Sequence, residues 1–224
     1  MFERSKNAKA LEQFVKSNWI NGLTNEEALK NIEEGLVEII YPEGVHKANG
    51  MLITKNGYFL SCKHCLNDGF DRSRIRTFDG RVYPLEKICI EDETNDLVLA
   101  KINIKNKSFP KHYRFYNANR IEKIPVQLIT RWDNKLTQKY GFILRDWDPY
   151  PNVDGKLYRD NISMNNISTK GDSGGVVVSP FLEIMGFHHG GNKETSSSIK
   201  LNKALDLVCK YVGYLKSANS FFKT

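Results

Sequence analysis

Short apolar runs separated by turn residues fill the chain from Leu36 onward, and this alternation limits the folds available to it. Such runs are typical of strands, and their short, even spacing is typical of a β-barrel or sandwich. The clearest hairpin signal is Asn56-Gly57 between Met51–Thr54 and Tyr58–Ser61, because an Asn-Gly turn matches the twist of paired strands. Further strands are expected at Leu36–Tyr41, Arg74–Phe78, Arg81–Leu85, Lys87–Ile90, Leu97–Ile102, Pro125–Thr130, Gln138–Asp146, Gly155–Asp160, Gly175–Ser179, Glu183–His188 and Ser196–Leu201.

Helical patterns stand before and after this β region. Apolar residues recur at helical spacing over residues 3–18. Thr24 and Glu27 form a capping box, which predicts a second helix from about Asn25 to Glu34. A third, amphipathic helix is expected from about Asn202 to Ser217. The expected organisation is a helical N-terminal extension (1–35), a first β unit (36–105), a linker (106–120), a second β unit (121–201) and a C-terminal helix and tail (202–224).

Composition narrows the classes of function. The 33 Lys and Arg against 26 Asp and Glu give a net charge of +7, but the basic residues are spread out and no nucleic-acid-binding motif is present. We therefore expect no nucleic-acid partner. No apolar run approaches the roughly 20 residues that a bilayer requires, so no membrane association is expected. The first residues lack the apolar segment of a signal peptide, and four cysteines in 224 residues do not make a disulfide scaffold. These features predict a cytoplasmic protein with reduced thiols.

The sharpest motif is the segment Gly171–Gly175, with the sequence Gly-Asp-Ser-Gly-Gly. A nucleophilic serine needs an exposed Oγ on a tight turn, a neighbouring base and backbone N–H groups that converge on an oxyanion. Gly171 permits a backbone geometry that aims its N–H at that point, and the N–H of Ser173 supplies a second donor. The alternative is a glycine-rich turn before a strand, with no chemistry.

Two further residues complete a candidate constellation. His64 directly follows an apolar strand, and Asp96 opens the buried strand Asp-Leu-Val-Leu-Ala. A base and an acid that orients it are what a serine nucleophile requires. An isolated His is more often structural, and acids at strand starts are usually solvated, so the context decides. Asp92 is a weaker competitor, since no apolar strand follows it directly.

With these motifs in the order His, Asp, Ser, the sequence resembles the chymotrypsin-like (trypsin-like) serine peptidases. The resemblance covers about Leu36 to Leu215 and leaves the N-terminal helices outside. It implies an all-β core of two six-stranded antiparallel β-barrels, with a helical extension and a C-terminal helix. It also implies a serine endopeptidase that works through an acyl-enzyme. His64 would be the general base and then acid, Asp96 would orient it, Ser173 would attack, and the N–H groups of Gly171 and Ser173 would form the oxyanion hole.

Two departures from the family stand out. Secreted members have a disulfide near the His, but no cysteine upstream of Cys65 lies where it could form that bond. The Cys62-x-x-Cys65 pair lacks the second cysteine pair of a zinc site. We therefore expect no metal and no cofactor. In zymogen-activated relatives the Asp before the Ser pairs with a new N-terminal amine. No activation sequence is evident here, so either Asp172 has another partner or the helical extension is cut.

The strand after the nucleophile, Ile184 to Asn192, resembles the Gly-x-His-x-Gly-Gly segment of glutamyl endopeptidases and viral 3C-like proteases. The resemblance implies that His188 lies in the primary specificity pocket with Ser168, and with Thr169 beside it. An imidazole and a hydroxyl can bind a Glu or Gln side chain, and such polar pairing rejects other residues. Gly190 and Gly191 would leave a strand edge open for the substrate. Alternatively, His188 is a packed strand histidine beside a small apolar pocket.

Trypsin-like members that cleave after Lys or Arg have an acid six residues before the nucleophile. Ile167 stands at that position here, which disfavours cleavage after basic residues. The expected partners are a protein or peptide substrate and a regulatory partner of the N-terminal helices. The alternative function is a catalytically silent, protease-like module that binds proteins.

Overall fold

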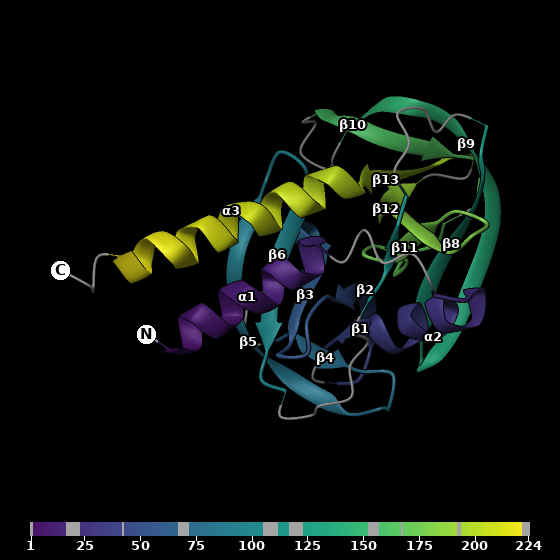
Figure 1. Ribbon diagram of the computed structural model, residues 1–224. Coiled ribbons are helices and arrows are strands. Elements are labelled where there is room, and N and C mark those ends of the chain that lie inside the picture. Colours follow the sequence, from purple (N-terminus) through teal and green to yellow (C-terminus); the bar gives the residue numbers. More distant parts are fainter. Residues whose placement is uncertain are drawn as a thin grey trace.

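The computed structural model describes residues 2–16, 23–41, 43–66, 72–104, 112–116, 123–151, 157–166, 168–191 and 194–220. The fold consists of two closed six-stranded antiparallel β-barrels with helices before and after them (Figure 1). This confirms the predicted fold class, which is compatible with a chymotrypsin-like fold. The division of the chain into domains at the boundaries given above stays a prediction.

The first barrel closes in the order β1-β2-β3-β6-β5-β4. Its strands are β1 (Leu36–Ile40), β2 (His46–Leu52), β3 (Tyr58–Cys62), β4 (Arg74–Arg76), β5 (Val82–Asp92) and β6 (Leu97–Ile102). The predicted Asn-Gly hairpin joins β2 to β3, with Met51 opposite Leu60. Gly57 has a φ of 89°, and a Cβ there would come within 2.1 Å of the Ile102 carbonyl oxygen, so this turn requires glycine.

The second barrel has the order β11-β8-β9-β10-β13-β12 and closes through the pairing of β11 with β12. A short strand, β7, adds to its edge in parallel with β12. The strands are β7 (Arg114–Phe115), β8 (Pro125–Trp132), β9 (Lys135–Pro151), β10 (Leu157–Met164), β11 (Val176–Val178), β12 (Glu183–Gly191) and β13 (Ser196–Lys200).

Several strand bounds differ from the prediction. The two strands predicted at Arg81–Leu85 and Lys87–Ile90 are one strand, β5, which begins at Val82 and whose register shifts against β6 account for the apparent break in the pattern. Strand β2 begins at His46, five residues before the predicted start at Met51. The sequence carries no sign of this earlier start because His46 and Lys47 are polar and partly exposed. Strand β7 lies in the segment expected to be a linker. Gly155, expected to start a strand, lies outside the described residues.

The helices are α1 (Phe2–Lys16), α2 (Asn25–Gly35) and α3 (Leu201–Ser220), with a 3-10 turn, η2, at Lys63–Leu66. The predicted capping box of α2 is present, with Thr24 Oγ1 accepting from the Glu27 N–H at 3.2 Å. Helix α3 packs on α1 and on strands of both barrels (Figure 1). Among the residues described, none of the helices has the length and apolar character needed to cross a bilayer.

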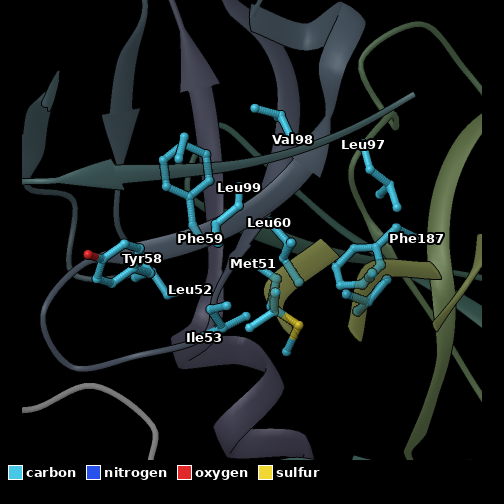
Figure 2. Close-up of a cluster of buried hydrophobic side chains, with 14 of the residues drawn as sticks. Met51, Leu52, Ile53, Tyr58, Phe59, Leu60, Leu97, Val98, Leu99 and Phe187 are labelled. Carbon is cyan, nitrogen blue, oxygen red and sulfur yellow. The ribbon is translucent and has the colours of Figure 1, made fainter. Parts of the chain in front are cut away.

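A single apolar core joins the first barrel to all three helices. Phe59 and Leu60 of β3 lie in its centre with Leu99 of β6, and Phe187 of the second barrel reaches the same cluster (Figure 2). Leu11 of α1 is fully buried in this core. The helices are therefore part of the packed structure, and any partner would contact their exposed faces.

Candidate active site

His64 and Asp96 meet where two paired strands of the first barrel end and begin. His64 lies in η2 directly after β3, and Asp96 directly precedes β6, the neighbour of β3. The Asp96 carboxylate accepts twice from His64, from the backbone N–H at 2.9 Å and from ring Nδ1 at 2.5 Å. Asp96 has a φ of 51°, in the left-handed region that is strained for non-glycine residues and often found at functional sites.

The pKa values of Asp96 and His64 are both shifted far from their ordinary values. Burial raises the pKa of Asp96, but the hydrogen bonds from His189 and His64 outweigh it, so the pKa falls well below the usual range. Burial lowers the pKa of His64, but the Asp96 hydrogen bond and the neighbouring Cys65 outweigh it and raise the pKa to about 10. The carboxylate is therefore ionised and the imidazole is strongly basic.

A second histidine, His189, also binds Asp96. Its Nδ1 lies 2.7 Å from the same Asp96 Oδ2 that receives His64, and the two imidazole rings meet edge to face at 5.7 Å. The sequence predicted a role for His188 and none for His189. The available signal was the His-His pair in a strand, because neighbouring side chains in a strand point to opposite faces.

Ser173 lies at the same site, bonded to the carbonyl of His189. Its Oγ donates to that oxygen at 3.1 Å, and the side chain is half-buried. No hydrogen bond links Ser173 Oγ to His64 in the described part of the chain. The Nε2 of His64 instead lies 3.6 Å from Cys65 Sγ. Catalytic hydrogen bonds are often long or misaligned before substrate binds, so this geometry is compatible with either a resting enzyme or an inactive site.

Glycines shape the loop that carries Ser173. Gly171 has a φ of 100° and Gly174 a φ of 80°, and both conformations favour glycine. A Cβ on Gly174 would lie 1.9 Å from the Asn49 carbonyl oxygen, so the two barrels meet in backbone contact here. Within the described residues, the N–H groups of Gly171 and Ser173 find no hydrogen-bond acceptor. Both are therefore available as donors to an oxyanion.

Asn49 of β2 clamps this loop to the first barrel. Its Nδ2 donates to the Gly171 carbonyl at 2.8 Å, and its backbone N–H donates to the Ser173 carbonyl at 2.7 Å. Its Oδ1 accepts from the Arg131 N–H at 2.7 Å, and its carbonyl accepts from Ser61 Oγ at 2.6 Å. Two of these four contacts hold the loop that carries Ser173, and the other two fix Asn49 to β8 and β3. One asparagine in a strand gave no sequence signal.

The Gly171 carbonyl has a second contact, with a buried histidine side chain that also contacts Glu38. His46 Nε2 lies 3.0 Å from this oxygen, and His46 Nδ1 lies 3.2 Å from Glu38 Oε1. Glu38 and the Gly171 carbonyl each offer an oxygen to the ring, so His46 connects a carboxylate of β1 to the loop that carries Ser173. Burial raises the pKa of Glu38, but the His46 hydrogen bond and the Asn134 N–H outweigh it, and the pKa is lowered.

The predicted specificity residues are placed only in part. His188 is buried opposite Ser198 in the register of β12 and β13. Burial lowers its pKa to about 3, so the ring is neutral. Ser168 Oγ lies 2.5 Å from the point where a Cβ on Gly191 would be, which puts Ser168 against the β12 edge. No hydrogen bond joins Ser168 to His188 where both are described, and Gly190 lies opposite Ser197.

Thr169 is engaged elsewhere, since its N–H and Oγ1 both bind the Asp172 carboxylate, at 2.6 and 3.0 Å. Ile167 lies outside the described residues.

Unpaired polar groups concentrate on the strands around His188. Five buried side chains of β10, β12, β13 and the turn after β10 have an N or O atom without a hydrogen-bond partner among the described residues. They are Asn161, Asn166, His188, Ser197 and Ser198. Buried polar groups are nearly always paired, so such a concentration favours a region that receives a polar ligand or water.

Four side chains at the site could hold a metal ion. The donor atoms of Cys62, His64, Asp96 and His189 all lie within 4.8 Å of one another. The two N–O distances of 2.5 and 2.7 Å are shorter than the roughly 3.3 Å between ligands around a tetrahedral zinc with bonds of about 2.0–2.1 Å. Hydrogen bonds account for the present arrangement. The expectation of no metal stays a prediction.

No protein-family model matches the chain, and no curated protein matches it.

Proposed function

We propose that the protein is a serine endopeptidase that uses Ser173, His64 and Asp96. The observation that carries the proposal is the meeting of a His64–Asp96 pair with a glycine-bounded serine loop whose two N–H donors are unoccupied. The order of the motifs and the double barrel are both compatible with the chymotrypsin-like peptidases that the sequence resembles.

Each group has a definite task in this mechanism. Ser173 Oγ attacks the scissile carbonyl carbon while His64 Nε2 takes the hydroxyl proton, and Asp96 stabilises the imidazolium. The N–H groups of Gly171 and Ser173 donate to the oxyanion of the tetrahedral intermediate. His64 then gives its proton to the leaving amine, and an acyl-enzyme remains. Water repeats the sequence, with its proton passing to His64, and releases the acid and free Ser173.

His64 must turn away from Cys65 for the first step. The hydrogen bond from Nδ1 to Asp96 anchors one side of the imidazole ring. The side chain is 40% exposed, so the ring has space to turn. We expect substrate binding to bring Nε2 to Ser173 Oγ.

The proposed substrate preference is Glu or Gln before the cleaved bond, with His188 and Ser168 in the pocket and the open strand edge at Gly190 and Gly191 pairing with the substrate. Because burial keeps His188 neutral, a Glu carboxylate would bring an unpaired charge into a buried site. A Gln amide can both donate and accept without that cost. The neutral ring therefore favours Gln of the two. Thr169 is bound to Asp172, so its proposed contribution is to hold Ser168 in place.

The second candidate is a catalytically silent module that binds peptides in the same groove. The observation that favours it is that Ser173 Oγ donates to the His189 carbonyl while His64 Nε2 faces Cys65. A site that stayed in this arrangement with substrate bound would have no base for its serine.

Cleavage of a peptide library, read by mass spectrometry, separates the two. The wild type is expected to cut after Gln, and less often after Glu, and Ser173→Ala is expected to abolish every cut. The matched control is Ser179→Ala, which removes a buried hydroxyl bound to Glu183 and is expected to leave cleavage unchanged. Cuts that persist in Ser173→Ala would overturn the assignment, and binding without cuts would favour the silent module.

A further inference from the structure

The carboxylate beside the nucleophile already has a cation within the chain. Asp172 is 4% exposed, and its Oδ2 accepts from Lys139 Nζ at 2.5 Å. Lys139 belongs to β9, and its side chain is 23% exposed. Lys139 Nζ also donates to Thr169 Oγ1 at 2.9 Å. Resting on the peptidase proposed above, we propose that Lys139 is a positioning residue that holds the nucleophile loop in its catalytic form, so that the uncut chain is competent.

The Lys139 ammonium neutralises a charge that also folds the loop. The Asp172 N–H donates to the Thr169 carbonyl at 3.0 Å, and the Asp172 carboxylate accepts from the Thr169 N–H at 2.6 Å. The Gly175 N–H then donates to the Asp172 carbonyl at 3.0 Å. Two consecutive turns are closed in this way, and between them they contain Gly171 and Ser173, the two proposed oxyanion donors.

Removal of the ammonium would leave a buried carboxylate without its counter-ion. Such a group either takes up a proton or turns toward water. Either change weakens the bond to the Thr169 N–H and frees the turn that holds Gly171. Burial raises the pKa of Asp172, but Lys139 and Thr169 outweigh it and lower the pKa, which agrees with a carboxylate ionised by its partners. The expected damage is to turnover more than to substrate affinity, because the oxyanion forms only during the reaction.

A new N-terminal amine made by cutting the chain would find Asp172 already paired with Lys139. The Asp172 Oδ2 already accepts three bonds, and its Oδ1 lies 3.4 Å from Thr130 Oγ1. Of the two alternatives that the sequence left open, the structure favours another partner for Asp172 over cleavage of the helical extension.

The experiment uses the full-length protein and three variants of one lysine. Lys139→Met is expected to lower kcat at least tenfold with a smaller change in KM, and Lys139→Arg to recover most of the loss. The kcat of Lys139→Ala is expected to be partly rescued by added ethylammonium, which is smaller than the three-carbon ammonium that the substitution removes. The matched control is Lys200→Met, because Lys200 has the same 23% side-chain exposure and pairs with Asp146 at 3.0 Å in the same barrel. It is expected to retain wild-type kcat.

The outcomes separate the two proposals. Wild-type activity at the intact mass of all 224 residues, with the losses above, supports the inference. Equal kcat in Lys139→Met and Lys200→Met overturns the inference and leaves the peptidase intact, as does activity that appears only after the chain is cut. No cleavage and no fluorophosphonate labelling, before or after cutting, overturns the peptidase itself. If Lys139→Met fails to fold, absence of ethylammonium rescue in a folded Lys139→Ala decides against the inference.

Discussion

The two barrels differ in what their interiors contain. Strands β1, β3 and β6 of the first barrel are buried at every residue, and most of their apolar side chains share one core with three helices and with part of the second barrel. The described interior of the second barrel has a separate, smaller apolar cluster: Val126, Leu128, Ile143, Ile162, Met164, Val177 and Met185. Five of the ten buried side chains with an unpaired polar atom in the described part of the chain lie on β10, β12, β13 and the turn after β10, among them His188 and Ser198.

This difference indicates that the two barrels have different roles. The first barrel holds His64 and Asp96 on a tightly packed base, and through Asn49 and His46 it also holds the loop of the second barrel. The second barrel has buried polar groups around the proposed pocket, where apolar side chains would otherwise pack. Stability is therefore expected to depend mainly on the first barrel, and substrate choice on the second.

The largest effect is expected from Phe59→Ala in the first barrel. Phe59 is fully buried at the centre of the shared core (Figure 2), and truncating a buried Phe costs about 3–5 kcal/mol. Urea unfolding of wild type and variant would measure the loss. A loss under about 1 kcal/mol would show that this core is not the main source of stability.

Asn49→Leu breaks the link between the barrels at similar side-chain volume. It leaves the Arg131 N–H without a partner and removes one of two bonds to the Gly171 carbonyl, so the expected cost is about 1–3 kcal/mol, together with a fall in kcat. The matched control is Asn31→Leu, which loses one amide bond to the His112 carbonyl far from the loop. Steady-state kinetics should show a fall in kcat for the Asn49 variant alone. Equal kcat in both would mean that the clamp does not position the loop.

His188→Leu tests the second barrel. Replacing an incompletely paired buried imidazole with an apolar side chain is expected to change the free energy of unfolding by no more than about 1 kcal/mol. The preference for Gln in the peptide library is expected to fall roughly tenfold or more, because polar pairing is what rejects other side chains. An unchanged cleavage profile would show that His188 is a packed strand histidine.

The smallest effect is expected from Cys65→Ala, in the pH profile. General-base action needs neutral His64, so activity rises with pH through the pKa of His64, which lies above its ordinary value of 6.5. Cys65 raises that pKa, so removing the thiol should move the rising limb of kcat/KM to lower pH. A shift in the opposite direction, or activity that falls across this limb, would contradict the role of His64 as base.

Short-range signals in the sequence predicted much of the fold. The Asn-Gly hairpin at Gly57, the capping box of Thr24 and the apolar spacing of the last helix each depend on neighbouring residues, and all three are present. Residues that act across the sequence could not be found in this way. Lys139 lies 33 positions from Asp172, and His189 lies 93 positions from Asp96. Nothing local distinguishes these side chains from an ordinary surface lysine or strand histidine.

The most direct test of the central claim is covalent labelling by a fluorophosphonate, followed by intact-mass and peptide mapping. We expect one adduct on Ser173 in the wild type, no adduct in Ser173→Ala, and a greatly slowed reaction in His64→Ala. Folded wild-type protein that takes up no label, or label that remains in Ser173→Ala, would contradict a serine nucleophile activated by His64.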